Sequence, residues 1–270
     1  MDELPYSQRK GIICQIHKGK SLSRDDLSNW RPISLTNVDY KILAKLLAIR
    51  LNTVIDSLVD KDQKGFIRGR SAAQLLREID DIIENNMNAK TTGILLSIDY
   101  RKAFDSISTK FLGNVFGHFG FGNYFQRWIR IILKGRINCV KNGGHISEDF
   151  EMQRGIRQGC PVSPMIFVLA VEIMANYIRS DIHISGIKIK HSKNVIKQYA
   201  DDTTLFLKDK TEFKRAIDKL NVFAAVSGLQ LNNDKSSFMV LGGNICWGEK
   251  EFEIKRVEEL DILGFILRLT

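Results

Sequence analysis

The pattern of hydrophobic and polar positions predicts short strands and longer helices along the chain of 270 residues. Runs rich in β-branched, aromatic and leucine residues predict strands, and apolar residues at helical spacing predict amphipathic helices. The expected strands cover 11–16, 30–35, 93–98, 136–141, 145–152, 195–199, 203–207 and 260–267. The expected helices cover 38–59, 72–86, 109–119, 123–134, 165–178 and 211–226. This mixture predicts an α+β fold in which helices pack on one face of a sheet.

The clearest hairpin is predicted around Q-Y-A-D-D-T-T-L-F, where strand-like runs flank the adjacent carboxylates Asp201 and Asp202. Aspartate often serves only to form a turn. Two like charges on a rigid hairpin are nevertheless unfavourable unless a cation neutralises them. Mg²⁺ prefers carboxylate oxygens and keeps coordination positions for phosphate groups. The pair therefore predicts a metal site, and such a site needs one more carboxylate from elsewhere in the chain.

Asp99 is the candidate for that third carboxylate, because it stands at the end of the apolar strand 93–98. A carboxylate in this position usually belongs to a site or caps a helix. Asp105 and Ser108 are better placed to cap the helix 109–119. Asp99 is therefore free to join the pair of aspartates on the hairpin.

Glycine and proline keep the stretch R-G-I-R-Q-G-C-P-V-S-P, residues 154–164, out of regular structure. Ser163 caps the next helix and Pro164 takes its first position, so the loop should be held firmly. Gln158 within it is either an ordinary exposed polar residue or a substrate contact.

Three further basic segments contain residues that are candidates for binding phosphate groups. The loop D-Q-K-G-F-I-R-G-R-S, residues 62–71, contains glycines and cations and suits either phosphate contact or a plain basic turn. In the hairpin near the N-terminus, Lys18 and Lys20 are typical of solvated surface charge. Arg31 is harder to dismiss, because it lies in a strand expected to reach the core. Lys235 lies at a turn between the last helix and a following strand.

The amino-acid composition says little about which molecules the protein binds. The net charge is +9 and the isoelectric point is about 9.3, which fits a nucleic-acid partner although many basic proteins bind none. The four cysteines show no C-x-x-C spacing, so neither a zinc site nor a disulfide framework is expected. The N-terminus lacks the apolar stretch of a signal peptide, and no apolar run is long enough to span a membrane. We expect an intracellular protein, cytoplasmic and nuclear, without a membrane partner.

The ordered motifs give a more specific indication, because together the chain resembles the reverse transcriptase domain of non-LTR (LINE-type) retrotransposons, in the L1/Tx1-like group. The resemblance covers about residues 5–267. It rests on N-W-R-P-I-S-L-T-N-V-D-Y-K-I-L-A-K, Q-K-G-F-I-R-G-R, S-I-D-Y-R-K-A-F-D-S, R-G-I-R-Q-G-C-P-V-S-P, Q-Y-A-D-D-T-T-L-F-L, G-L-Q-L-N-N-D-K-S and I-L-G-F. A group II intron or retron enzyme is the related alternative, and the first and third motifs favour the LINE type.

The resemblance implies a right-handed polymerase with an antiparallel palm sheet. Its fingers would be residues 1–90 and 106–150, and its palm residues 91–105 and 151–270. The thumb and an endonuclease would be absent, so the chain looks like a fragment of a longer reading frame. The implied activity is RNA-directed DNA polymerisation, in which dNMP passes from a dNTP to the 3′-hydroxyl of a DNA primer on an RNA template. The rival hypothesis is a catalytically idle nucleic-acid-binding remnant, although such a remnant should have lost residues such as Asp99 or Gln158.

The resemblance also implies roles for individual residues. Two Mg²⁺ ions, or Mn²⁺ in their place, would be bound by Asp99, Asp201 and the more peripheral Asp202, with the carbonyl of Tyr100 as a further ligand. Phe104 matches the bulky residue that excludes a ribose 2′-hydroxyl. The remaining implied roles are nucleotide contacts by Gln158, triphosphate contacts by Arg31, Lys18 and Lys20, template or nucleotide contacts by Arg68 and Arg70, and protonation of pyrophosphate by Lys235.

Overall fold

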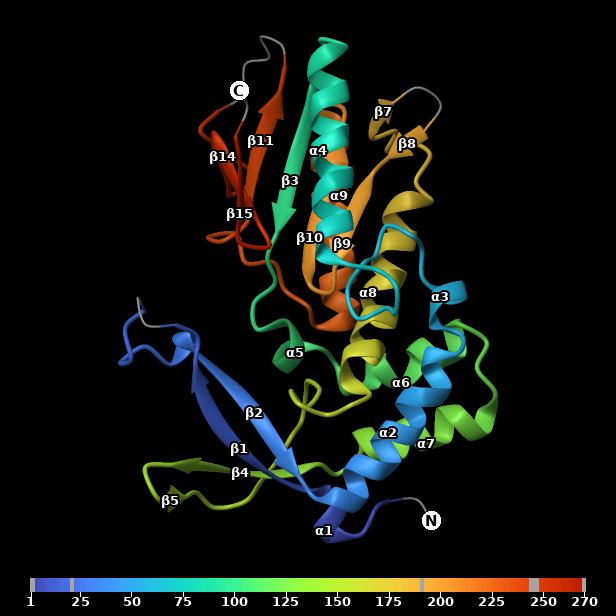
Figure 1. Ribbon diagram of the computed structural model, residues 1–270, viewed down its shortest axis with the longest axis vertical. Helices are drawn as coiled ribbons and strands as arrows, with labels where there is room; N and C mark the ends of the chain where they lie inside the picture. The colour runs from blue at the N-terminus through green and yellow to red at the C-terminus, as the bar shows by residue number, and fades with distance from the viewer. Residues whose placement is uncertain (1–2, 20–21, 190–191, 243–247, 269–270) are drawn as a thin grey trace. The chain divides into compact units, whose positions relative to one another are not determined.

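The computed structural model describes residues 3–19, 22–189, 192–242 and 248–268 (Figure 1). Its chain divides into two compact units. Unit 1 comprises Met1–Val54 and Phe104–Ile166, and unit 2 comprises Ile55–Ala103 and Phe167–Thr270. Residues 55–90 therefore belong to the same unit as Asp99 and Asp201, and residues 151–166 belong to the other.

The sheet of unit 1 is built on a hairpin near the N-terminus. Its members are β1 (Lys10–His17), β2 (Trp30–Thr36), β4 (Ile137–Asn142), β5 (His145–Ile146) and β6 (Phe150–Glu151). The order is β2-β1-β4-β5, and β6 pairs with β4. β1 runs antiparallel to β2 and parallel to β4. The predicted hairpin near the N-terminus is confirmed, and the predicted strand 136–141 pairs antiparallel with two short strands within 145–152.

The helical elements of unit 1 are short. The prediction of one long helix over 38–59 is therefore wrong. The elements are α1 (Tyr6–Arg9), η1 (Leu27–Asn29), α2 (Val38–Asn52), α5 (Ala103–Ser106, at the unit boundary), α6 (Thr109–His118) and α7 (Asn123–Leu133). After α2 the Thr53 hydroxyl donates to the carbonyl of Arg50 at 2.7 Å. The three successive β-branched residues Thr53, Val54 and Ile55 also have a low helix propensity. The chain resumes as a separate turn of helix, α3 (Ile55–Leu58).

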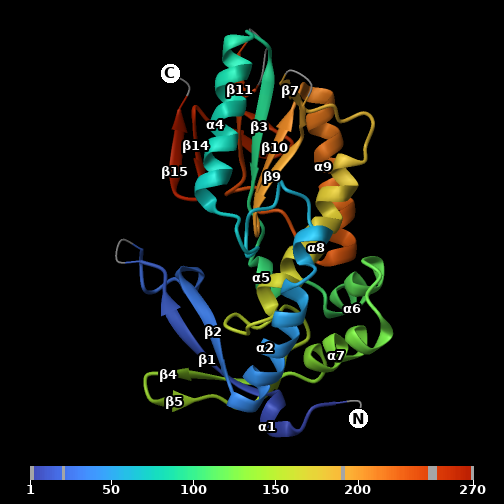
Figure 2. The ribbon, with the colours of Figure 1, turned by 45° about the vertical axis from the view of Figure 1, so that its right-hand side comes forward.

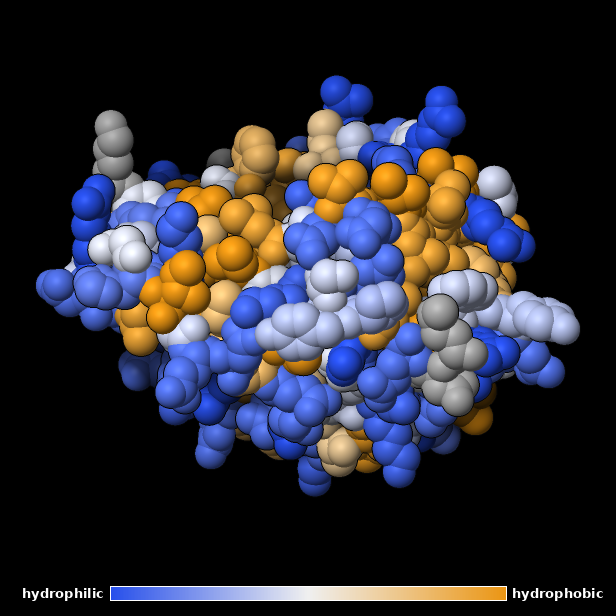
Figure 3. All heavy atoms as spheres, turned by 90° about the horizontal axis from the view of Figure 1, so that it is seen from below, coloured by the Kyte–Doolittle hydropathy of each residue, from blue (hydrophilic) through white to orange (hydrophobic). Residues whose placement is uncertain are grey.

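One face of α2 is apolar but exposed. Val38, Ile42, Leu46 and Ile49 follow each other at helical spacing, and Leu46 is 55% exposed. Leu46 therefore does not face the core, although it lies at apolar spacing in the helix predicted over 38–59. The buried face instead carries Tyr40, Ala44, Leu47, Ala48 and Leu51. Figure 3 shows apolar side chains gathered among hydrophilic ones on the side of the molecule seen from below.

The sheet of unit 2 has six strands in the order β12-β13-β11-β3-β10-β9. They are β12 (Lys250–Glu251), β13 (Ile254–Arg256), β11 (Ser237–Leu241), β3 (Gly93–Ile98), β10 (Asp202–Leu207) and β9 (Ile196–Tyr199). Strand β3 lies between β10 and β11 and runs antiparallel to both. Two further hairpins, β7 (Ile187–Ile189) with β8 (Ser192–Asn194) and β14 (Glu259–Ile262) with β15 (Phe265–Arg268), complete the strands of this unit.

Helices cover both faces of this sheet, whereas the sequence pattern led us to expect them on one (Figure 2). On one face, α4 (Ala72–Asn88) packs its apolar side against alternate residues of three strands, including Leu95, Phe206 and Met239. On the other face lies α9 (Lys210–Ser227), whose Phe213 ring contacts that of Phe238 at 5.1 Å between centroids. The predicted α+β class with antiparallel sheets is confirmed. The apolar α8 (Ser163–Arg179) is buried along residues 167–171, as its sequence predicts.

Candidate active site

Strand pairing in unit 2 brings the three predicted carboxylates together at one edge of the sheet, where the end of β3 lies beside the start of β10. Asp99 directly follows β3, and Asp202 is the first residue of β10. The register pairs Thr203 with Ile98, so Asp99 and Asp202 both lie one residue beyond that pair. Asp201 and Ala200 form the turn between β9 and β10. The predicted hairpin is confirmed, and its tip meets the end of the neighbouring strand.

The charges at this edge repel one another. Desolvation raises the pKa of Asp201, and the negative charge of Asp99 acts in the same direction. Desolvation raises the pKa of Asp202 to about 6, although its side chain still reaches solvent, and the charges of Asp201, Asp99 and Asp261 add to the rise. Such a site favours a cation, and carboxylate oxygens are the ligands that Mg²⁺ prefers. Within the described ranges, however, no group of three or more His, Cys, Asp or Glu side chains is arranged to hold a metal ion.

A turn after α9 holds Asp99 in place. The Asn232 side-chain amide donates to the Asp99 carboxylate at 2.8 Å, and the Asn232 backbone N–H donates to the Asp99 carbonyl at 2.9 Å. The Ser236 hydroxyl accepts from the Asp99 N–H at 3.1 Å. Lys235 lies exposed in the same turn, so the structure brings its segment beside Asp99. Sequence reasoning did not identify Asn232 or Ser236, although both lie inside the motif that contains Lys235.

Tyr100 anchors the chain after Asp99. Its side chain is buried, and its hydroxyl donates to the Met174 sulfur at 2.7 Å. Burial raises the pKa of the Tyr100 phenol above its ordinary value. The ring therefore serves the core of unit 2, and metal binding by the Tyr100 carbonyl stays a prediction.

In unit 1, the loop of residues 154–164, which contains Gln158, is hydrogen-bonded both to Phe104 and to β2. The Ile156 N–H donates to the Phe104 carbonyl at 2.7 Å, and the Ser34 N–H of β2 donates to the Gln158 carbonyl at 2.8 Å. Phe104 and Gln158 are each partly buried. Arg31 is exposed on β2, contrary to the expectation that this position reaches the core. The segments that carry Phe104, Gln158 and Arg31 therefore belong to one hydrogen-bonded framework.

Two buried arginines support this loop, and neither was identified from the sequence. Arg136 donates to the carbonyls of Leu133 and Gly155 at 2.9 and 2.7 Å. Burial lowers the pKa of Arg136 to about 10. Arg157 donates to the Ile137 carbonyl at 3.0 Å and lies over the ring of Tyr40, 5.3 Å from its centroid. These contacts make the loop a rigid part of unit 1.

The remaining predicted cations have different surroundings. The Lys18 ammonium donates to the Ser28 carbonyl at 2.7 Å, and Lys20 lies outside the described residues. The Arg70 guanidinium binds carbonyls within its own part of unit 2, those of Gln63 at 2.7 Å and Val59 at 3.1 Å among them. It also pairs with the Asp56 carboxylate at 2.8 Å. The hydrogen-bond donors of Arg70 are thus used within unit 2. Of the two arginines predicted to contact template or nucleotide, Arg68 is the exposed one.

Sequence comparison identifies the family. The profile of the family described as "Reverse transcriptase (RNA-dependent DNA polymerase)" matches residues 16–267. The chain belongs to the reverse transcriptase family. It is 31% identical over 245 residues to the "Transposon TX1 uncharacterized 149 kDa protein" of Xenopus laevis, a match that covers 89% of this chain and 18% of that protein.

Two Drosophila melanogaster proteins are also similar to this reverse transcriptase chain. One is the "Retrovirus-related Pol polyprotein from type-2 retrotransposable element R2DM", 28% identical over 86% of this chain and 21% of that protein. The other is the "Probable RNA-directed DNA polymerase from transposon X-element", 26% identical over 82% of this chain and 23% of that protein. The resemblance to non-LTR retrotransposon proteins is thus confirmed. The chain spans about a fifth of the length of these relatives.

Solved telomerase structures share the fold of this reverse transcriptase chain. The apo telomerase of Candida tropicalis, truncated from its C-terminal domain, superposes with a TM-score of 0.62 at 15% identity, over 99% of this chain and 55% of that chain. The Candida albicans telomerase with a fragment of telomeric RNA gives a TM-score of 0.64 at 12% identity, over 99% and 46%. At these identities the likeness concerns the fold alone. Among the described residues, every helix is too short or too polar to span a membrane.

Proposed function

We propose that this chain is the RNA-directed DNA polymerase module of a non-LTR retrotransposon protein. It would transfer dNMP from a dNTP to the 3′-hydroxyl of a DNA primer on an RNA template. The observation that carries this proposal is the meeting of Asp99 with the Asp201–Asp202 hairpin at one edge of the unit 2 sheet, in a chain of the reverse transcriptase family. The relative described as a "Probable RNA-directed DNA polymerase" supports the same activity.

We infer that these carboxylates would bind divalent cations, since carboxylate oxygens are the ligands that Mg²⁺ prefers. Asp99 and Asp201 would be the principal ligands, with Asp202 peripheral and the Tyr100 carbonyl as a further ligand. Two Mg²⁺ ions, or Mn²⁺, would supply positive charge for the triphosphate and for the attacking hydroxyl. The raised pKa values of Asp201 and Asp202 support this reading, because desolvation and the neighbouring negative charges disfavour the ionised carboxylates, and a bound cation would offset both.

Other side chains would select and orient the nucleotide. The Phe104 ring would occupy the space that a ribose 2′-hydroxyl needs, and Gln158 would line the same pocket. Arg31 is exposed, and a planar guanidinium suits bidentate contact with phosphate. Lys235 would donate a proton to the departing pyrophosphate. Contacts with template and primer would be mainly to phosphate and 2′-hydroxyl groups, so binding should weaken as salt rises.

Incorporation of dTTP on a poly(rA)/oligo(dT) template with Mg²⁺ tests the proposal. Asp201→Asn keeps the shape of the side chain and removes its charge, and Asp80→Asn makes the same change at an exposed position of α4. We expect incorporation by the wild type and by Asp80→Asn, and none by Asp201→Asn. Undiminished incorporation by Asp201→Asn would contradict the proposed site. A folded wild type that neither incorporates dTTP nor binds it in a Mg²⁺-dependent way would be the idle nucleic-acid-binding remnant.

A further inference from the structure

The turn that carries Asp201 has a strained backbone. Ala200 has a φ of 57°, in the left-handed region that residues other than glycine seldom adopt. It is also only 3% exposed. A non-glycine residue in this region costs roughly 1–2 kcal/mol, so the surrounding structure must hold it there. The strain thus points to whatever contacts the Ala200 backbone.

Gln63 makes those contacts. Its side chain is fully buried, at 0% exposed. Its Oε1 accepts from the Ala200 N–H at 2.8 Å and from the Gly65 N–H at 2.8 Å, and its Nε2 donates to the Ala200 carbonyl at 3.3 Å. The two N–H groups fix the orientation of the amide, because only its oxygen can accept from them. One side chain therefore binds both polar groups of the strained residue.

The loop around Gln63 reaches the turn by pairing with the edge strand β9. We name residues 60–70 the clamp loop. The Lys64 N–H donates to the Gln198 carbonyl at 2.8 Å, and the Gln198 N–H donates to the Asp62 carbonyl at 2.9 Å. A Cβ at Gly65 would lie 2.3 Å from the Ala200 nitrogen, so only glycine permits this approach. The clamp loop thus extends the sheet beside the hairpin and touches its tip.

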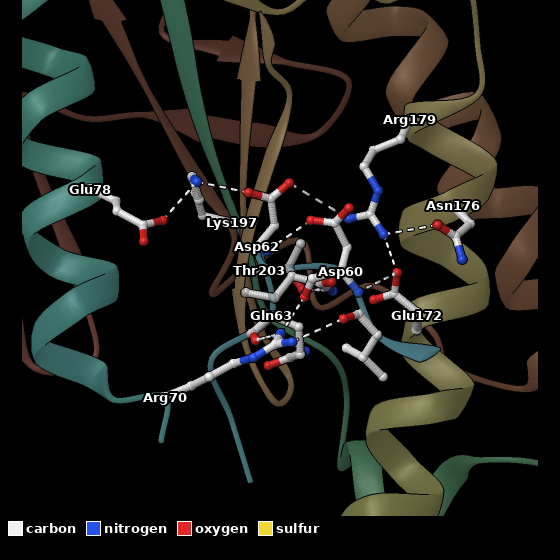
Figure 4. Close-up of polar contacts among 12 residues, drawn as sticks. Asp60, Asp62, Gln63, Arg70, Glu78, Glu172, Asn176, Arg179, Lys197 and Thr203 are labelled. Carbon is white, nitrogen blue, oxygen red and sulfur yellow. Dashed lines mark hydrogen bonds and ion pairs between the residues drawn. The ribbon is translucent and has the colours of Figure 1, made fainter. Parts of the chain in front are cut away.

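Ion pairs fix the clamp loop to the elements around it (Figure 4). Lys197 of β9 binds Asp62 and the α4 residue Glu78, each at 2.7 Å, and Lys64 binds Glu78 at 2.6 Å. Arg70 holds the loop from within through the Gln63 carbonyl at 2.7 Å. Gln63 is therefore presented to the turn from a rigid support.

We propose that Gln63 is a positioning residue, whose amide holds the Ala200–Asp201 turn in the conformation in which the hairpin carboxylates bind divalent cations. This inference rests on the proposed function. Gln63 itself touches no carboxylate, and it acts through the backbone of Ala200. Changes to groups that orient metal ligands typically lower metal affinity by about 10–100-fold. We expect a loss of that size when the Gln63 amide is removed.

Gln63→Met is the primary test, because it keeps the length of the side chain and removes all three hydrogen bonds of the amide. Asn86→Leu is the matched control: Asn86 is a buried amide of α4, and its Nδ2 donates to the Thr91 hydroxyl at 2.8 Å. Mn²⁺ affinity is measured by electron paramagnetic resonance, and amide hydrogen exchange reports on residues 199–203. We expect Gln63→Met to weaken Mn²⁺ binding about tenfold or more and to speed exchange at the turn. Asn86→Leu should change neither, even where both variants lose the same stability.

Gln63→Asn serves if Gln63→Met does not fold, because its amide is shorter by one methylene and cannot reach Ala200. Wild-type Mn²⁺ affinity in the folded Gln63 variant would overturn the inference and leave the proposed function standing. The inference and the proposed function would both be overturned if the wild type bound no Mn²⁺, or if Asp201→Asn bound Mn²⁺ as tightly as the wild type. The two failures are thereby distinguished.

Discussion

Gly155→Ala should disturb the exclusion of ribonucleotides by way of Phe104. Gly155 has a φ of 77°, and its N–H donates to the Ile107 carbonyl at 2.7 Å. A Cβ at this position would lie 2.7 Å from the carbonyl oxygens of both Phe104 and Asp105. Alanine therefore requires a shift of the backbone that carries the Phe104 ring.

The expected loss of stability follows from two contributions. An alanine in the left-handed region costs roughly 1–2 kcal/mol, and overpacking against a fixed backbone costs about 1–3 kcal/mol. We therefore expect the free energy of unfolding to fall by about 2–5 kcal/mol. Gly113→Ala is the matched control, because its Cβ would lie 3.8 Å from the nearest side-chain atom, within helix α6. That variant should gain up to about 1 kcal/mol.

Urea unfolding measures these free energies, and the ratio of kcat/KM for dUTP to that for UTP on poly(rA)/oligo(dT) measures sugar discrimination. We expect the ratio to fall about tenfold in Gly155→Ala, the size of effect that a small change in pocket fit produces. Gly113→Ala should retain the wild-type ratio. Equal stability of the two variants would refute the close approach of Gly155 to Phe104. A destabilised Gly155→Ala with unchanged discrimination would refute the role of Phe104.

Two further predictions concern ion pairs of unit 2. Arg179→Met should lower the free energy of unfolding by about 3 kcal/mol in urea, because buried Glu172 loses its partner, and adding Glu172→Met should recover part of it. Full additivity of the two changes would contradict this coupling. Hydrogen bonding by Arg215, with Lys219 adding to it, holds the pKa of Asp181 well below its ordinary value. Asp181→Asn should therefore have a lower melting temperature than the wild type above about pH 4. The difference between the two melting temperatures should shrink as the pH falls. A difference that does not depend on pH would refute this.

The local patterns of the sequence predicted the carboxylate hairpin well. The runs of β-branched, aromatic and leucine residues form β9 and β10, which are buried along most of their length, and the polar pair between them marks the turn. Asp99 was predictable because a carboxylate at the end of an apolar strand is unusual. The cap of α6 by Ser108 also follows from local chemistry, and its hydroxyl accepts from the Phe111 N–H at 3.3 Å.

Contacts between distant segments were not predictable in this way. Gln63 looks like any polar loop residue, and its role appears only when the clamp loop meets the turn at Ala200. Arg157 lies in a recognised motif, but its burial over Tyr40 depends on tertiary packing. One local contact was missed as well: Thr53 binds back to the preceding turn at the end of α2, where apolar periodicity alone suggested a continuous helix. In each case the deciding partner is a backbone group or ring that the sequence pattern does not identify.

If the hairpin carboxylates hold the divalent cations used in polymerisation, Asp201→Cys should change which metal ion supports the reaction. A thiolate binds Mg²⁺ poorly and accepts softer metals better than a carboxylate does. On poly(rA)/oligo(dT), we predict that Asp201→Cys loses dTTP incorporation with Mg²⁺ and regains part of it with Mn²⁺, whereas Asp80→Cys incorporates dTTP with either metal. Wild-type incorporation by Asp201→Cys with Mg²⁺ would show that the Asp201 carboxylate does not hold the catalytic cations.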